Sequence, residues 1–203
     1  MAFEADNEEA RRLVEMMTEK HSLLYRHALN VAFLAGSIAE VVGLNRKIRE
    51  TEIYLFGLLH DVGWLNFRDE LFTKKKSEYT EQDFEDHFFE PYEAWKILQG
   101  TKTLKKYATV ALKCHEQPEG DGYPEGIHLH KIDRISRVVS VACRYSTIIE
   151  DHRLEGRDLA PHMIDRSLHK DIVLFFGRKA EEIERALLTG QTMNDKYWNA
   201  RRH

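Results

Sequence analysis

The stretch Leu55–Gly63 (LFGLLHDVG) decides the fold, because an apolar run ends there on an imidazole and a carboxylate. Adjacent residues of a helix point to different sides. His60 and Asp61 can therefore lie on the same side only where the helix ends, unless both bind a group that lies between them. Neutral imidazole and carboxylate are good ligands for first-row metals. We therefore predict that His60 and Asp61 anchor a metal site at the end of a helix.

The composition is that of a soluble globular chain. Of its 203 residues, 42% are hydrophobic and 32% are charged, which suits one compact domain with a small appendage. The net charge of −4 indicates no binding of a nucleic-acid polymer. The start lacks a signal-peptide core, no apolar run is long enough to span a bilayer, and the two cysteines do not form a disulfide scaffold pattern. We predict a cytoplasmic protein without membrane attachment.

Apolar residues recur at helical spacing along almost the whole chain, and no strand pattern stands out, so we predict an all-α fold. The expected helices cover 7–21, 22–42, 46–59, a segment from Thr80 onward, 104–115, 132–150, and 159–198 in two or three pieces with breaks near Gly177 and Gly190. We divide the chain into an N-terminal helix (1–21), a core (22–155) and a C-terminal helical extension (156–203).

Single residues predict where one of these helices starts and is interrupted. Thr80, with Asp83 three residues later, forms an acidic variant of the capping box and predicts a helix start. Pro91 should kink that helix or divide it in two, because proline lacks the backbone N–H. The preceding segment, 64–79, is predicted to be a loop in which Lys74–Lys76 are solvated.

Further ligand types lie on other predicted helices. His27 is on the apolar face of its helix, and His115 ends another. A single buried histidine is usually satisfied by a backbone carbonyl. Burying several imidazoles with a carboxylate, however, is costly unless they are paired or bind metal. A metal centre shared by His27, His60, Asp61 and His115 is therefore the better interpretation.

A second motif, CHEQPEGDGYP at 114–124, extends this pattern. Together with HALNV at 27–31 and LLHDVG at 58–63, it resembles the HD-GYP branch of the HD-domain phosphohydrolases. The spacing from CHE to GYP matches that family without a gap, and the similarity covers about residues 22–150. The resemblance implies an all-α HD-domain bundle, bound iron or manganese, and hydrolysis of cyclic di-GMP in bacterial signalling by a metal-bound hydroxide.

The resemblance also implies the metal ligands and a bridging role for Asp61 between two metals. Carried over by position, the ligands are His27, His60, Asp61, Glu90, Cys114, His115 and Cys143.

Three of these positions depart from the family, which has histidine at 90 and 114 and aspartate at 143. Glu90, Cys114 and Cys143 can all bind metal, and thiolates favour iron or zinc over manganese. Small buried cysteines can equally fill the space of a decayed site. His87, one helical turn before Glu90, is an alternative ligand. We predict one or two divalent transition metals, with iron, manganese and zinc as candidates.

Other departures remove charge from the expected substrate site. Trp64 stands where the family has a lysine, Leu23 where some members have a glutamate, and the Arg-Pro-Tyr-Lys stretch that grips phosphates is not recognisable. Gly122 and Tyr123 are candidates for substrate binding, although Gly-Tyr-Pro can also be a simple turn. Arg137 faces the same region by alignment and is a candidate for phosphate binding, with a surface salt bridge as its alternative.

We predict a metal-dependent phosphohydrolase, a cyclic di-GMP phosphodiesterase with His60 and Asp61 as its catalytic pair. The substrate is a cyclic dinucleotide or another phosphate ester. The alternative is a catalytically degenerate domain that binds nucleotide or a signalling partner without turnover. The resemblance implies a diguanylate cyclase domain as partner, and a homodimer is left open.

Overall fold

The computed structural model describes residues 7–156 and 164–200, with the backbone alone at 192–200. Its α-helices are α1 (Glu8–Lys20), α2 (Ser22–Val41), α3 (Glu50–Leu58), α4 (Glu81–Gln99), α5 (Ala108–Lys113), α6 (Arg134–Leu154), α7 (Arg166–Phe176) and α8 (Ala180–Ala200). Short 3-10 helices join them: η1 (Leu44–Arg46), η2 (Val62–Asn66), η3 (Asp69–Phe72), η4 (Lys76–Glu78), η5 (Lys105–Tyr107), η6 (Leu129–Lys131) and η7 (Gly177–Lys179). The described residues form no strand, so the all-α prediction is confirmed.

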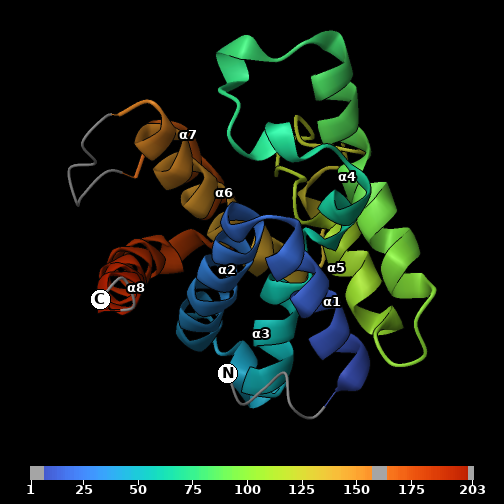
Figure 1. The fold of residues 1–203 in the computed structure, drawn as a ribbon. Coiled ribbons are helices and arrows are strands. Elements are labelled where there is room, and N and C mark those ends of the chain that lie inside the picture. Colours follow the sequence, from blue (N-terminus) through green and yellow to red (C-terminus); the bar gives the residue numbers. More distant parts are fainter. Residues whose placement is uncertain (1–6, 157–163, 201–203) are drawn as a thin grey trace.

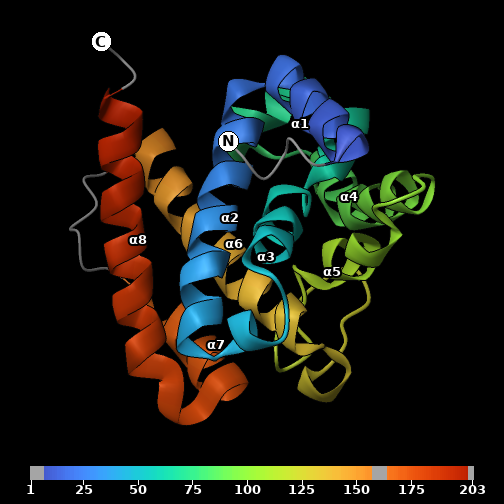
Figure 2. The same ribbon diagram turned by 90° about the horizontal axis from the view of Figure 1, so that it is seen from below.

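Helix α2 lies at the centre and packs against α1, α3, α6 and α8 (Figures 1 and 2). Its sequence is apolar on nearly all sides, which is typical of a helix surrounded by protein. Ala28, Ala32, Ala35 and Ala39 are almost completely buried, and such small side chains allow close approach of the neighbouring helices. The α8 helix runs alongside α2 in Figure 2, so the C-terminal helices pack directly on the core.

Helix starts follow the predicted caps. The Asn7 side chain accepts a hydrogen bond from the Ala10 N–H at 3.0 Å, so α1 begins where expected. The third helix begins later than predicted, at Glu50, because a separate 3-10 turn takes up Leu44–Arg46. The predicted start of the C-terminal helices near Leu159 lies outside the described residues, and the boundaries at 21 and 155 stay predictions.

The capping box at the start of α4 is the anchor of the segment before it. The buried Asp83 carboxylate accepts from the Thr80 backbone N–H at 2.7 Å and the Thr80 hydroxyl at 2.8 Å. It also pairs with Lys74, and with Arg68 at 2.8 Å. The hydrogen bond from Lys74 and those from Thr80 hold the pKa of Asp83 well below its ordinary value.

Two predicted helix breaks do not occur. The α4 helix continues through Pro91, so of the predicted kink or division the division is wrong. Its packing against α5 and η2 holds the helix together at a residue that cannot donate a backbone hydrogen bond. The α8 helix likewise continues through Gly190, which faces α2 at a point where an added Cβ would lie 3.1 Å from Leu34 Cδ2. Gly190 therefore serves close packing of two helices.

The segment between α3 and α4 loops out at the top of Figure 1. It contains three short 3-10 helices and is otherwise irregular, as the predicted loop at 64–79 suggested. None of the helices in the described part of the chain has both the length and the apolar character that a bilayer crossing requires.

We expect Asp83→Asn to lower the melting temperature at neutral pH, and the difference from the unchanged protein to shrink as the pH falls. The folded-state pKa of Asp83 is lowered, so its carboxylate stabilises the fold above the unfolded pKa of about 4, and this stabilisation is lost as the pH falls through the folded pKa. Thermal melts at neutral pH and at about pH 3 test this. The exposed Glu78→Gln is the matched control, and identical pH curves for the two variants would contradict the assignment.

Candidate metal centre

Potential metal ligands from five separate parts of the chain meet in the interior. The α2 helix contributes His27, the end of α3 contributes His60 and Asp61, α4 contributes Glu90, the turn after α5 contributes Cys114 and His115, and α6 contributes Cys143. The structure thus brings together every residue of the predicted ligand set. All of these side chains are buried or nearly so.

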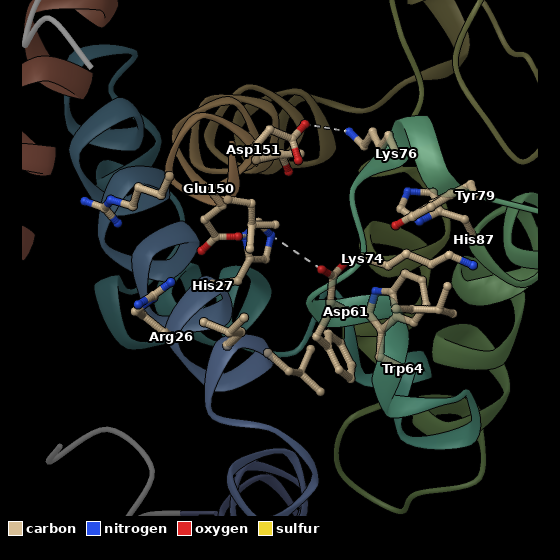
Figure 3. Close-up of a pocket in the computed structure, with 17 residues that line it drawn as sticks. Arg26, His27, Asp61, Trp64, Lys74, Lys76, Tyr79, His87, Glu150 and Asp151 are labelled. Atoms are coloured by element: carbon tan, nitrogen blue, oxygen red, sulfur yellow. Dashed lines mark hydrogen bonds and ion pairs between the residues drawn. The ribbon is translucent and has the colours of Figure 1, made fainter. Parts of the chain in front are cut away.

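Asp61 lies at the middle of the cluster, and its two carboxylate oxygens face different imidazoles. Its Oδ2 is 3.4 Å from Nε2 of His27, as the dashed line in Figure 3 marks. Its Oδ1 is 3.0 Å from Nε2 of His60 and 3.1 Å from Nε2 of His115. A carboxylate that offers one oxygen to each side is arranged as a bridge between two cations.

The possible donors form two groups. Within each group the donor atoms lie within 4.8 Å of one another: His27, His60 and Cys143 in one, and Asp61, Cys114 and His115 in the other. Cys143 Sγ is 3.7 Å from His27 Nε2 and 3.8 Å from His115 Nδ1, so its sulfur lies between the two groups. Glu90 belongs to neither group, but its Oε2 lies 3.7 Å from Nε2 of His115.

Hydrogen bonds on the far side of two rings orient the ligand nitrogens. Nδ1 of His60 donates to the Gly57 carbonyl at 2.6 Å, while its Nε2 faces Asp61 Oδ1 at 3.0 Å. Nδ1 of His27 lies 3.1 Å from both Glu150 Oε2 and Ser146 Oγ, which turns its Nε2 toward Asp61. This is the usual outer contact of a metal-binding histidine.

Glu90 is a buried carboxylate that accepts no hydrogen bond from the described residues. It is 1% exposed, and within the described part of the chain neither of its oxygens has a hydrogen-bond partner. The nearest imidazole nitrogen, His115 Nε2, is 3.7 Å away. Burial, together with the nearby Asp61 charge, raises the pKa of Glu90 well above its ordinary value. A buried carboxylate that accepts no hydrogen bond and lies beside His115 is well suited to a cation, so the donors present fit a metal.

The charges of the cluster favour the binding of a cation. Burial alone would lower the pKa of His27, but the Glu150 carboxylate and Cys143 outweigh it and raise that pKa to about 10. The pKa of His60 is also raised against the effect of burial, chiefly by Asp61. A metal binding here would replace protons with its own charge.

The two cysteines have different surroundings. Burial would raise the pKa of the Cys143 thiol, but His115 and His60 outweigh it and lower that pKa well below its ordinary value. Burial raises the pKa of Cys114, whose thiol donates to the Ala111 carbonyl at 3.3 Å. Cys143 therefore has the environment of a thiolate ligand, whereas Cys114 has that of a buried thiol.

The Gly-Tyr-Pro loop folds over His115. The Tyr123 ring stacks on the His115 ring with centroids 4.8 Å apart and planes 4° from parallel. Its backbone N–H donates to the His115 carbonyl at 3.2 Å. A Cβ on Gly122 would lie 2.4 Å from the Gln117 nitrogen, so only glycine permits this approach.

Glu116, which the sequence did not single out as a site residue, supports this loop from inside. Its carboxylate is fully buried and accepts from the backbone N–H groups of Glu125 at 2.8 Å and Ile127 at 3.0 Å. Glu150 was also missed as a partner of His27. A signal existed, because Glu150 follows Cys143 by seven residues and thus shares its helix face.

Two predicted residues lie apart from the ligand groups. Arg137 donates to the carbonyls of Ile132 at 2.8 Å and Leu129 at 2.9 Å, and it does not line the cleft described below. His87 lines that cleft, with its ring 5.2 Å from Trp64, but belongs to neither donor group. Burial lowers the pKa of His87 to about 4, so its ring is neutral at physiological pH.

A cleft of about 350 Å³ reaches the cluster at His27 and Asp61 (Figure 3). Aromatic rings line one wall: Trp64, Phe72, Tyr79 and His87. Four cationic side chains also line it: Arg26, Lys74, Lys76 and Arg153. The prediction that Lys74–Lys76 are solvated is wrong for Lys74, which pairs with the buried Asp83, whereas Lys75 and Lys76 are exposed and Lys76 pairs with Asp151.

Comparisons with known proteins point to one family. A family model described as an HD domain matches residues 11–163. The chain is 26% identical over 195 residues to a cyclic di-GMP phosphodiesterase of Thermotoga maritima, covering 86% of this chain and 52% of that protein. It is 30% identical over 125 residues to a cyclic di-GMP phosphodiesterase of Borreliella burgdorferi, covering 62% of this chain and 32% of that protein.

A third relative acts on a different cyclic dinucleotide. The chain is 26% identical over 151 residues to a 3′3′-cGAMP-specific phosphodiesterase of Vibrio cholerae, covering 72% of this chain and 34% of that protein. This chain spans about half the length of the Thermotoga maritima relative and about a third of the other two.

We expect Gly122→Ala to destabilise the fold by about 1–3 kcal/mol, because the added Cβ overlaps the backbone of the turn after α5. Urea denaturation measures the change. Gly100→Ala is the matched control, since a Cβ there meets only ordinary contacts at 3.4 Å. Equal stability of the two variants would show that the loop does not need the close approach.

Proposed function

The chain belongs to the HD domain family, and from that premise we propose that it is a metal-dependent phosphohydrolase that cleaves a cyclic dinucleotide. The central support is Asp61, a buried carboxylate with imidazole nitrogens within 3.4 Å on both of its oxygens, at the base of a cleft. The names of the relatives, cyclic di-GMP and 3′3′-cGAMP phosphodiesterases, support this class of substrate.

We propose one or two bound divalent ions, drawn from iron, manganese and zinc. The buried Glu90 oxygens, which accept no hydrogen bond from the described residues, and the buried His60 Nε2 beside Asp61 support this proposal. The first ion would be held by His27, His60, Asp61 and Cys143, and the second by Asp61, Glu90, Cys114 and His115. Such ions polarise a phosphoryl oxygen and lower the pKa of water. The thiolate character of Cys143 favours iron or zinc.

The remaining residues position the ligand imidazoles and enclose the site. Glu150 and the Gly57 carbonyl keep the Nε2 atoms of His27 and His60 facing Asp61. The Tyr123 ring covers His115 and restricts its rotation. The aromatic wall of the cleft offers flat faces on which a nucleobase can stack. We propose that this wall holds the base while the phosphodiester lies over Asp61.

One feature supports the alternative of binding without turnover. Trp64 is only 8% exposed and packs against Phe67, Phe72 and His87, so an indole occupies the position of a cation. In-line attack on a phosphodiester needs positive charge against the equatorial oxygens. A chain that binds the dinucleotide but leaves it intact would fit this alternative.

The partner predictions rest on the family resemblance. A diguanylate cyclase domain as partner and a homodimer both stay predictions. The candidate substrate-binding role of Tyr123 and Gly122 belongs to this proposal as well, because their loop packs directly on His115.

We expect the purified protein to contain one or two equivalents of transition metal and to cleave cyclic di-GMP. His60→Ala should lose most of the metal and all measurable cleavage, because it removes a buried donor nitrogen beside Asp61. Elemental analysis and chromatography of the products provide the two readouts, with the exposed His130→Ala as control.

The same experiment separates the alternatives. Metal-loaded protein that binds cyclic di-GMP by calorimetry but yields no product would identify a degenerate binding domain. Metal-loaded protein that neither binds nor cleaves it would end the cyclic di-GMP proposal.

We expect Glu150→Gln to weaken metal binding by about 10- to 100-fold, because the hydrogen-bond partner that orients His27 loses its charge. Titration of metal-depleted protein with Zn²⁺ measures this directly. The exposed Glu78→Gln should bind Zn²⁺ like the unchanged protein. Unaltered affinity in Glu150→Gln would show that His27 does not depend on this contact.

A further inference from the structure

A cleft that receives a phosphodiester needs a cation facing it. The position directly after the His-Asp-Val-Gly turn carries Trp64, which brings no charge. The cationic side chains that do line the cleft come from α2, α6 and the segment between α3 and α4. Arg26 and Arg153 already have interactions of their own. The remaining candidates for binding an anionic ligand are the ammonium groups of Lys74 and Lys76.

Lys74 has a structural role. Its ammonium pairs with Asp83, a carboxylate that is 1% exposed and also caps α4. In Figure 3 the Lys74 ammonium points away from Asp61. Releasing it would leave a buried carboxylate with one partner fewer, which is costly.

Lys76 is held far more loosely. Its ammonium lies 3.0 Å from Asp151 of α6, and the two side chains are 50% and 37% exposed. Exposed ion pairs of this kind contribute little to stability. Figure 3 shows the pair spanning the cleft between η4 and α6, with His27 and Asp61 on the inner side. An anion in the cleft can therefore take the place of Asp151.

We propose that Lys76 is the phosphate-binding residue of the cleft, and that Asp151 occupies its ammonium until a phosphate ester replaces it. The inference rests on the proposed function, since it assigns a substrate contact at the same site. A phosphate oxygen accepts the same kind of charge-assisted bond from an ammonium as a carboxylate oxygen does, and the exposed pair that it replaces contributes little to stability. Lys76, in the segment between α3 and α4, thus supplies the positive charge that Trp64 does not provide.

This arrangement makes Asp151 a competitor of the substrate. Removing its charge should strengthen phosphate binding, but only while Lys76 is present. A purely structural role of the pair predicts the opposite, because loss of either partner would then loosen the segment and weaken binding. The two roles are therefore separable by a double-mutant cycle.

The test measures binding of cyclic di-GMP by calorimetry to the full chain and to Lys76→Gln, Asp151→Asn and the double variant. We expect Lys76→Gln to weaken binding by about tenfold or more. Asp151→Asn should tighten binding by a few fold, and should have no effect in the Lys76→Gln background. Lys75→Gln is the matched control, because Lys75 is exposed and lines a neighbouring groove rather than this cleft. Thermal melts confirm that each variant is folded.

The outcomes distinguish this inference from the proposed function. If Lys76→Gln binds and cleaves cyclic di-GMP like the unchanged chain, the Lys76 site is wrong and the phosphodiesterase stands. If cyclic di-GMP is not bound but GMP or inorganic phosphate is, with the same dependence on Lys76, the anion site stands and the substrate class falls. If the unchanged chain binds none of these three probes, the Lys76 site is overturned.

Discussion

The buried charge of Asp61 is the constraint on which the rest of the structure depends. A carboxylate that is 5% exposed needs compensation, and imidazoles from α2, the end of α3 and the turn after α5 surround it. Each imidazole is fixed in turn by a contact further out, as with His60 and the Gly57 carbonyl. The cluster therefore links otherwise separate helices through electrostatics, and a metal would strengthen that link.

Close backbone approach makes this cluster possible. A Cβ on Gly63 would lie 2.3 Å from the Glu90 carbonyl oxygen, so the turn after Asp61 can reach α4 only with glycine at this position. The same contact places the Glu90 carboxylate beside the cluster. Gly122 plays a corresponding part in bringing Tyr123 onto His115. The glycines of both motifs thus bring ligands together without binding anything themselves.

In this cleft the positive charge is provided by a different element from the turn that carries Trp64. Trp64 adds to an aromatic wall at the inner turn, and positive charge comes instead from the segment between α3 and α4. That segment is anchored at one point by the buried Asp83 and at another by the exposed Asp151. Lys74 and Lys76 therefore differ in freedom although they stand two residues apart. Exposure of the partner carboxylate, rather than sequence position, separates a structural lysine from a binding one.

The sequence by itself determined the helical class and the caps at Asn7 and Thr80, because periodicity and capping are local properties, and its motifs and their resemblance to a family indicated the chemical types that meet around Asp61. Only the tertiary structure decided that α8 continues through Gly190, that Glu150 holds His27, and that Arg137 bonds to backbone carbonyls outside the cleft. These depend on which helices pack together and at what distance. A single sequence carries no direct record of such contacts, since the partners lie far apart along the chain.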